Sequence, residues 1–517
     1  MSEQLDLVLL RGHGDLPRGW SAAPVRAVAT LVRGVTYKKA ESAREPATGM
    51  VGVLRATNIG SEIDLEELVY VPESNVKPEQ MVRAGDVLMA TSSGSLSVVG
   101  KCAPARRDLG AAFGAFCMVV RPVTELAPLL GQFFRTPSYR SHVSRVAAGV
   151  NINNLKRGDI EPIIVPIPPL PEQRRIVAEI EKQFTRLDAA VANLERVKAN
   201  LKRARASVLK AAVEGRLVPT EASLARAEGR DYEPASVLLE RILEERERRH
   251  REENPKKKYK PPVEPDTEGL PELPGGWAWV TINQTSTLVR NGYSKKPDDD
   301  GETPILRISA VRPCFVDRED SRRLRTPLSE LEGATAKPGD LLFTRYNGTR
   351  ALVGVSGLLR GEGPVVHPDK LIRVVPIAPL VSGAFVEKAV STGESRAFIE
   401  RRIRTTAGQS GVSGSDIKQL PFPLPPMAEQ KRIVVEVERQ LSRLDALESV
   451  VAANLARSES LRQSILKRAF EGKLVPQDPN DEPASALLER IQAETAATKP
   501  KKKRAKKATK RRKNKPA

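Results

Sequence analysis

The segment Arg345-Tyr-Asn-Gly-Thr-Arg350 contains the side chains of this chain that could most clearly form specific hydrogen bonds with another molecule. An arginine guanidinium offers two parallel donors that fit the edge of guanine, and an asparagine amide pairs in a similar way with adenine. Lysine, in contrast, mostly holds phosphate. The segment therefore has the side chains of a base-reading loop, although an ordinary polar turn would use the same residue types.

Catalytic signatures are absent from the sequence. It contains no GxGxxG after a strand, no GxxxxGK(S/T) phosphate loop and no HExxH metal motif. It also lacks the Asn/Asp-Pro-Pro-Tyr/Phe segment with which amino-methyltransferases hold a flipped base. The four histidines, His13, His142, His250 and His367, lie too far apart in sequence to suggest one site. We therefore predict a binding protein with no catalytic residue and no metal site, and an unrecognised methyltransferase or nuclease centre is the alternative.

The charge of the chain indicates a polyanionic partner. The 517 residues carry a net charge of +20, and nucleic acid is the default partner of such a basic chain. Twelve Lys or Arg and no acid follow Glu494, which leaves +8 for the rest. We expect residues 499–517 to form a disordered basic tail, either as a solvated extension or as a weak phosphate-binding segment.

The cysteines and the apolar runs indicate the compartment. Cys102, Cys117 and Cys314 have no CxxC spacing and cannot form a disulfide framework, which fits a reducing cytosol. No run of 18 apolar residues occurs, and the N-terminus has no basic region followed by an apolar core. We therefore predict a cytoplasmic protein that is neither secreted nor membrane-spanning.

A helix-like segment that could position such loops occurs twice. Residues 171–219 and 428–476 match without a gap at an offset of 257 residues, so that Glu172 aligns with Glu429. Both copies repeat apolar residues at 3-4 spacing over more than four heptads, which is typical of a coiled-coil seam. Some 40 residues at ~1.5 Å each predict helices roughly 60 Å long. The alternative is two helices that are each buried in their own domain.

Fifteen apolar residues form the predicted seam, and four polar ones interrupt it. The seam residues are Val177, Ile180, Phe184, Leu187, Val191, Leu194, Leu201, Val208, Val434, Val437, Leu441, Leu444, Val451, Leu455 and Ile465. The interruptions are Lys198, Arg205, Glu448 and Ser458, so the seam is not uniformly apolar.

Two globular regions, residues 1 to about 165 and about 271 to 425, precede the two helices. Each mixes short β-like runs with Gly, Ser and Pro turns, and residues 126–146 read as helix, which favours α+β domains. Framework residues repeat: Trp277 follows Trp20 by 257 residues, and Asp340 follows Asp86 by 254. The loops differ, which indicates one fold used for two targets.

Two motifs bracket each helix and carry a resemblance to a known family. A Pro-rich P-x-P-P-x-x-E-Q introduces each helix, and E-G-(R/K)-L-V-P closes it. Two variable domains alternating with two near-identical helices resemble the specificity subunit of type I restriction–modification systems, over essentially the whole chain except the basic tail. The alternative is a coiled-coil scaffold whose globular domains bind protein.

The resemblance implies a fold and a set of partners. The fold is α+β, with two α/β target-recognition domains separated by two long conserved helices that pair as an antiparallel, pseudo-two-fold symmetric coiled coil. Each domain would read one half of a bipartite double-stranded DNA site, and the helices would set the spacing. Two methyltransferase subunits using S-adenosylmethionine and motor-endonuclease restriction subunits using ATP and Mg²⁺ would dock on a chain that is not an enzyme and binds no cofactor.

The expected domain organisation follows from these elements. Residues 1–168 form target-recognition domain 1, 169–215 the central conserved helix, 216–270 a charged helix and linker, 271–426 target-recognition domain 2, 427–472 the C-terminal conserved helix, 473–498 a linker with a short helix and 499–517 the tail.

The loops that differ between matched framework segments are the expected DNA contacts, with solvated polar turns as the alternative for each residue. In the first domain they contain Tyr37, Lys38, Lys39, Ser92, Ser93, Ser95, Lys101, Asn151, Asn153 and Asn154. In the second they contain Tyr293, Lys295, Lys296, Arg345, Asn347, Thr349, Arg350, Gln409 and Ser410.

Overall fold

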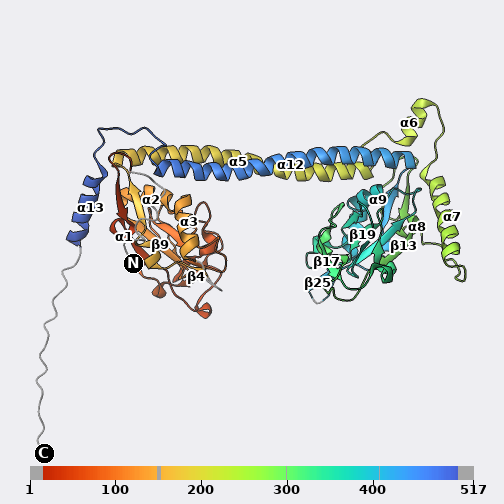
Figure 1. Ribbon diagram of the computed structural model, residues 1–517, viewed down its shortest axis with the longest axis horizontal. Helices are drawn as coiled ribbons and strands as arrows, with labels where there is room; N and C mark the ends of the chain where they lie inside the picture. The colour runs from red at the N-terminus through yellow and green to blue at the C-terminus, as the bar shows by residue number, and fades with distance from the viewer. Residues whose placement is uncertain (1–15, 148–152, 299, 407, 499–517) are drawn as a thin grey trace, which may run out of the picture. The chain divides into compact units, whose positions relative to one another are not determined.

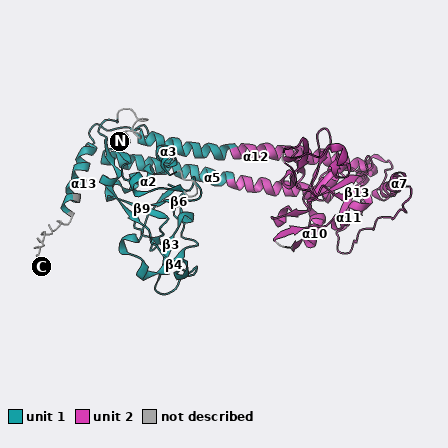
Figure 2. Ribbon diagram, turned by 60° about the horizontal axis from the view of Figure 1, so that its bottom comes forward, with its two compact units in different colours: residues 1–194, 453–517 teal, residues 195–452 magenta. Residues whose placement is uncertain are grey.

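The computed structural model describes residues 16–147, 153–298, 300–406 and 408–498, so that Asn151 and the basic tail lie outside the described residues. The chain forms two compact units (Figure 2): unit 1 comprises residues 1–194 and 453–517, and unit 2 comprises residues 195–452. Each unit contains a β-rich domain and part of both long helices, α5 (Leu170–Val213) and α12 (Met427–Phe470), which are divided between the two units in Figure 2. Figure 1 shows the same elements along the chain. The predicted α+β architecture with two long helices is confirmed.

Unit 1 is built around a four-stranded sheet and a smaller three-stranded one. The four-stranded sheet has the order β2 (Ala29–Arg33), β9 (Cys117–Pro122), β5 (Val87–Ala90) and β7 (Cys102–Pro104). The other has the order β4 (Val69–Pro72), β3 (Met50–Leu54) and β8 (Ala112–Phe113). The stretch expected to be one helix is two, α2 (Ala127–Phe133) and α3 (Pro137–Val146), because Thr136 caps a new helix whose first residue is a proline.

Unit 2 repeats this arrangement. Its main sheet has the order β13 (Ser286–Asn291), β23 (Leu371–Pro376), β19 (Leu341–Thr344) and β21 (Ser356–Leu358). Its second sheet has the order β17 (Ser321–Leu324), β14 (Thr303–Leu306), β22 (Val365–Val366) and β18 (Thr335–Ala336), and its helices include α9 (Gly383–Ala389) and α10 (Gly393–Arg402). The segment after α5 contains α6 (Glu221–Glu228) and α7 (Ala235–Glu253), whereas α13 (Ala484–Thr498), which follows α12, belongs to unit 1.

Both main sheets are held by one buried ion pair at the same place. In unit 1 the Arg121 guanidinium donates from Nε and Nη2 to the two carboxylate oxygens of Asp86, each at 2.7 Å. In unit 2 Arg373 Nε donates to Asp340 Oδ2 at 2.6 Å. These aspartates are the framework residues that the sequence repeats, so their function is to join neighbouring strands rather than to bind a ligand.

The long helices pair antiparallel within each unit. In unit 1 the start of α5 and the end of α12 enter one core through Ile180 and Leu466. In unit 2 the end of α5 and the start of α12 do the same through Ala212 and Ile433. The fifteen predicted seam residues are all buried or half-buried. The helices therefore pair with each other and are also built into the domain cores at their ends, which combines the two alternatives that the sequence left open.

Ion pairs cross between the helices where polar residues interrupt the seam. Arg205 on α5 pairs with Asp445 on α12, and Arg205 Nη2 also lies 3.4 Å from Glu448 Oε2. The 257-residue repeat gives the same pair in unit 1, where Arg462 meets Asp188. Two interruptions of the seam, Arg205 and Glu448, thus face each other, and their charges favour one antiparallel register.

The bracketing motifs meet at one junction in each unit. The Trp20 indole N–H donates to Glu172 Oε2 at 3.1 Å, and the Trp277 indole N–H donates to Glu429 Oε1 at 3.0 Å. Both carboxylates are almost fully buried, with side chains of 1% and 0% exposure in the two residues. Burial raises the pKa of Glu172 and of Glu429, and the indole hydrogen bonds oppose that rise.

The closing E-G-(R/K)-L-V-P motif completes this junction through its glycine. Gly472 has a φ of +68°, and a Cβ there would lie 2.5 Å from Pro17 Cγ. Gly215 has a φ of +66° and the same approach to Pro274. Only glycine combines this left-handed backbone with so close a contact. The motifs are therefore the parts of a joint that fixes each domain to the helix pair.

The Pro-rich lead-ins are edge strands of the domains. β11 (Ile164–Ile167) pairs with β1 (Ser21–Pro24), and β26 (Pro421–Leu424) pairs with β12 (Ala278–Thr281). Two-stranded pairing tolerates the missing proline N–H groups, which a central strand would not. Gln173 and Gln430 then bind the carbonyls of Pro168 and Pro425 at 2.8 and 2.9 Å, so the turn into each helix is fixed.

Trp277→Phe should lower the free energy of unfolding of the chain by about 1–3 kcal/mol, because the buried Glu429 carboxylate loses a donor. Urea denaturation of the full chain measures the change. Trp279→Phe is the matched control, since its indole N–H donates to Pro271 O at an exposed position, and it should cost less than about 0.5 kcal/mol. Equal losses for the two variants would contradict the assigned importance of the junction.

Candidate nucleic-acid interface

Two predicted loops of unit 2 are brought together by strand pairing. β20 (Tyr346–Asn347) pairs antiparallel with β25 (Gln409–Gly411), so that Asn347 lies opposite Ser410. Some 60 residues of chain separate these strands, and no local pattern of residues indicates that they meet. Pairing places the amides of Asn347 and Gln409 at the same hollow of about 1090 Å³.

The hollow beside this pair is strongly basic. Of the predicted residues, Tyr293, Lys295, Lys296, Asn347 and Gln409 line it. Its other charged residues, which the sequence analysis missed, are Arg307, Arg312, Arg322, Asp369 and Lys370. Six cations thus surround one carboxylate, and two amides lie among them. A basic concavity that also contains amide side chains suits a phosphate-bearing ligand.

The two arginines of the Arg345–Arg350 segment are engaged within the protein. The Arg345 guanidinium lies over the Tyr346 ring at 4.7 Å from its centroid, and Nη1 lies 3.9 Å from Asp369 Oδ2. Arg350 Nη2 donates to Glu400 O at 3.0 Å. Neither arginine lines the hollow, nor does Thr349, whose backbone N–H donates to Asn347 Oδ1 at 2.9 Å. Tyr346 and Asn347 are therefore the side chains of this segment that line the hollow.

Unit 1 has the same strand pair with different side chains. β6 (Ser92–Ser93) pairs antiparallel with β10 (Asn153–Asn154). The Ser92 hydroxyl donates to Asn154 Oδ1 at 2.8 Å, and Asn153 Nδ2 donates to Gly94 O at 3.3 Å. Ser95 bonds Ser97 through their hydroxyls at 2.8 Å. The half-buried or exposed side chains of these strands are thus Ser and Asn in one domain and Tyr, Asn and Gln in the other. Ser410 is buried, and its hydroxyl lies 2.9 Å from the Thr405 hydroxyl.

The remaining candidates of unit 1 lie at the surface near other elements. Lys38 and Lys39 are exposed, and Lys38 Nζ is 3.9 Å from Glu41 Oε1. Tyr37 packs on a small core around Val53. Lys101 is exposed on the return from the β6 loop.

A bulge changes one correspondence between the domains. The register of β13 shifts between Ser286 and Leu288, which adds a residue to this strand relative to β2. Tyr293 consequently occupies the place of Val35, since their N–H groups bond the equivalent carbonyls of His367 and Phe113. Tyr37 and Tyr293, both predicted DNA contacts, therefore lie at different places on the shared framework.

Comparisons with known proteins identify the family. No model of a protein family matches the chain. The chain is 37% identical over 501 residues to the type I restriction enzyme EcoKI specificity subunit of Escherichia coli (strain K12), which covers 94% of this chain and 97% of that protein. It is 32% identical over 510 residues to the type I restriction enzyme StySPI specificity subunit of Salmonella potsdam, with coverage of 96% and 100%. The chain belongs to the family of type I restriction enzyme specificity subunits.

A solved structure described as "Structural basis underlying complex assembly and conformational transition of the type I R-M system" shares the fold, with a TM-score of 0.57 at 19% identity over 89% of this chain and 100% of that one. Family membership confirms the prediction of a specificity subunit over a protein-binding scaffold. None of the described helices is long and apolar enough to cross a membrane.

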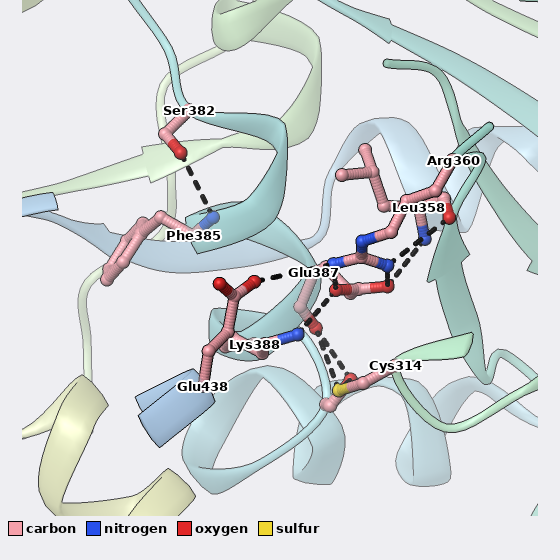
Figure 3. Close-up of polar contacts among 9 residues, drawn as sticks. Cys314, Leu358, Arg360, Ser382, Phe385, Glu387, Lys388 and Glu438 are labelled. Atoms are coloured by element: carbon pink, nitrogen blue, oxygen red, sulfur yellow. Dashed lines mark hydrogen bonds and ion pairs between the residues drawn. The ribbon is translucent and has the colours of Figure 1, made fainter. Parts of the chain in front are cut away.

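A second fully buried acid of unit 2, Glu387, has both carboxylate oxygens engaged within the protein. Figure 3 shows Glu387 on α9, where Oε1 accepts from Leu358 N at 2.6 Å and Arg360 Nη1 at 3.0 Å. Oε2 accepts from Arg360 Nη2 at 2.7 Å and Lys388 Nζ at 2.6 Å. Burial would raise the pKa of Glu387, but these cations outweigh it and the pKa is lowered. The cluster is a structural anchor, and Arg360 extends it to Glu438 on α12 at 3.9 Å.

Other titratable groups form no site in the described part of the chain. Among those residues, no three His, Cys, Asp or Glu side chains gather as metal ligands. His367, however, is fully buried directly before the turn that lines the hollow. Burial lowers the pKa of His367 to about 4, and the positive charges of Arg373 and Arg290 act in the same direction. The equivalent residue of unit 1 is Phe113, also fully buried.

His367 should make unit 2 sensitive to acid. In the unfolded chain His367 has a pKa near 6.5 and binds a proton below that pH, whereas in the folded protein it stays neutral down to about pH 4. The contribution of neutral His367 to the free energy of unfolding is therefore fully present above about pH 6.5. The free energy of unfolding falls by roughly 2–3 kcal/mol as the pH drops toward 4. Urea denaturation followed by tryptophan fluorescence between pH 7 and 4.5 measures this loss.

His367→Phe should remove this component of the pH dependence, because unit 1 already accepts Phe at that place. Phe113→His is the matched reverse substitution and should create the same acid sensitivity in unit 1. An unchanged pH dependence in His367→Phe would mean that other groups cause it.

Proposed function

We propose that this chain recognises double-stranded DNA with a bipartite target, each domain reading one half. The observation that carries the proposal is the pair of polar strands that both domains place on one shared framework with different side chains. Ser92 and Asn154 meet in unit 1, and Asn347 and Ser410 meet in unit 2. Amides and hydroxyls can bond base edges, and the lysines around the hollow can hold phosphates.

The long helices would set the spacing between the half-sites. Two readers on one duplex need a fixed separation and rotation, which a flexible linker cannot supply. The junctions at Trp20 and Trp277 and the ion pairs of Arg205 and Arg462 support a rigid connection, because they tie each domain to the helix pair through buried or charged contacts.

The partners are two methyltransferase subunits and the restriction subunits. Large apolar side chains remain exposed on the helices, where other helices could cover them. They are Val197, Val435, Leu447, Val450 and Leu461. The chain itself would be non-catalytic and bind no cofactor, whereas S-adenosylmethionine would belong to the methyltransferase subunits and ATP with Mg²⁺ to the restriction subunits.

Replacing residues 345–350 together with 409–410 by the sequence of another specificity subunit should change one half-site and leave the other intact. The reason is that the two strand pairs are in different units and share no residue. Sequencing of methylated adenines after expression with the methyltransferase subunits measures both halves. Alteration of both halves, or of neither, would contradict the assignment of one reader to each domain.

Removing one heptad from both helices, residues 195–201 and 452–458, should shorten the spacer. Seven residues correspond to about 10 Å of helix, or about three base pairs. We expect methylation at the native spacing to be lost or to move to a shorter spacing, while the half-site sequences stay the same. Unchanged methylation at the native spacing would exclude the helices as the measuring element.

Measuring DNA binding at increasing salt concentration distinguishes this proposal from a scaffold that binds DNA only through charge. Such a binder loses affinity as salt rises and shows no preference for a sequence, whereas a specificity subunit keeps its preference. The isolated chain incubated with S-adenosylmethionine tests the remaining alternative of an unrecognised methyltransferase, which would methylate DNA without partner subunits.

A further inference from the structure

One large aromatic side chain of unit 1 is exposed without any evident packing function. Phe116 is 70% exposed, whereas Phe113 and Phe134 of the same domain are fully buried. It occupies the tip of the turn between β8 and β9. A single exposed apolar side chain is common on protein surfaces, so the meaning of Phe116 depends on the elements that surround it.

The turn that carries Phe116 is fixed against the polar strand pair of unit 1. Thr91 N donates to Phe116 O at 2.8 Å, and Ser92 N lies 3.3 Å from the same oxygen. Cys117 N donates to Gly114 O at 2.8 Å and closes the turn. Phe116 is therefore held beside Ser92, whose side chain bonds Asn154, and the ring cannot move far from the proposed reading strands.

Unit 2 has the same turn, and there it belongs to the basic hollow. Arg345 N donates to Lys370 O at 2.8 Å, and Leu371 N donates to Pro368 O at 3.0 Å, which are the bonds of the Phe116 turn repeated. Lys370 thus occupies the place of Phe116. It lines the hollow together with Asn347 and Gln409. The position of Phe116 on the framework is therefore a position that faces the ligand.

We propose that Phe116 contacts the bases of the first half-site with the apolar surface of its ring, as a specificity-determining residue. The inference rests on the proposed function and deepens it. Phenylalanine can meet a thymine methyl group in the major groove or wedge against a base step in the minor groove. The second domain would use Lys370 at the same position to hold a phosphate, so the two domains would differ in chemistry at one shared site.

Phe116→Ala should weaken binding of the full-length chain, assembled with its methyltransferase subunits, to the first half-site by about 5- to 100-fold, the range for losing one aromatic–base contact. The sequence preference of that half should relax, and the second half-site should be read as before. Because no charge is removed, the dependence of affinity on salt should stay unchanged, whereas Lys370→Ala should reduce the salt slope by about one.

Controls separate this contact from a general effect on folding. Leu65→Ala removes an exposed apolar side chain elsewhere in unit 1, 37% exposed, and should leave both half-sites unaffected. Phe116→Leu keeps apolar surface and should lose less affinity than Phe116→Ala. Uracil in place of thymine reproduces the loss if the partner is a methyl group. Fluorescence of 2-aminopurine rises with the unmodified chain, and not with Phe116→Ala, if the partner is a base step.

The result that would overturn the inference is wild-type affinity and selectivity of Phe116→Ala for the first half-site. An equal loss at both half-sites, or a changed salt slope, would also overturn it, because these point to folding or charge. If the unmodified complex itself shows no sequence preference, the proposed function fails instead. The two failures are thus distinguishable in one set of binding measurements.

Discussion

The hydrogen bond between a buried indole and a buried carboxylate is the interaction on which the rest of each unit depends. Trp20 with Glu172, and Trp277 with Glu429, join the start of a domain to the start of a long helix. Around this bond the closing glycine, the Pro-rich edge strand and the helix that follows are all fixed. A carboxylate taken out of water without a donor is costly, so the indole hydrogen bond favours the arrangement in which the domain and the helix pair are joined. The motifs repeat in the sequence because each junction needs the same residues.

The two units differ in how a short helix of the domain is held at the neighbouring strand. In unit 2 Glu387 is buried among Arg360, Lys388 and the Leu358 N–H, and the cluster reaches Glu438 on α12. In unit 1 the corresponding helix carries Gly131, next to Pro104, which has no N–H to donate. A charged anchor in one domain is thus replaced by close packing in the other. Framework contacts can diverge when the group that needs a partner and the group that supplies it change together.

The faces that carry the candidate DNA contacts share their backbone hydrogen bonds but differ in their side chains. Backbone hydrogen bonds place the strand pairs and the neighbouring turn at equivalent positions in both domains, through Thr91 and Arg345. Because the backbone holds the geometry, the side chains there are free to differ, as Phe116 and Lys370 do. This separation of a constant backbone from variable side chains is what allows one fold to serve two target sequences. The long helices, in contrast, repeat their side chains because they must fit each other.

The sequence by itself determined the duplication, the helix pair and the family, because a gapless 257-residue offset and a 3-4 apolar spacing are local, periodic signals. It also selected Asn347, Gln409, Lys295 and Lys296, all of which line one hollow. Only the tertiary structure decided that Arg345 and Arg350 are bound internally, that β20 meets β25, and that Phe116 stands beside Ser92. These depend on contacts between segments tens of residues apart, which no local pattern encodes. Residue type predicts what a side chain can bind, but folding determines whether another part of the chain has already bound it.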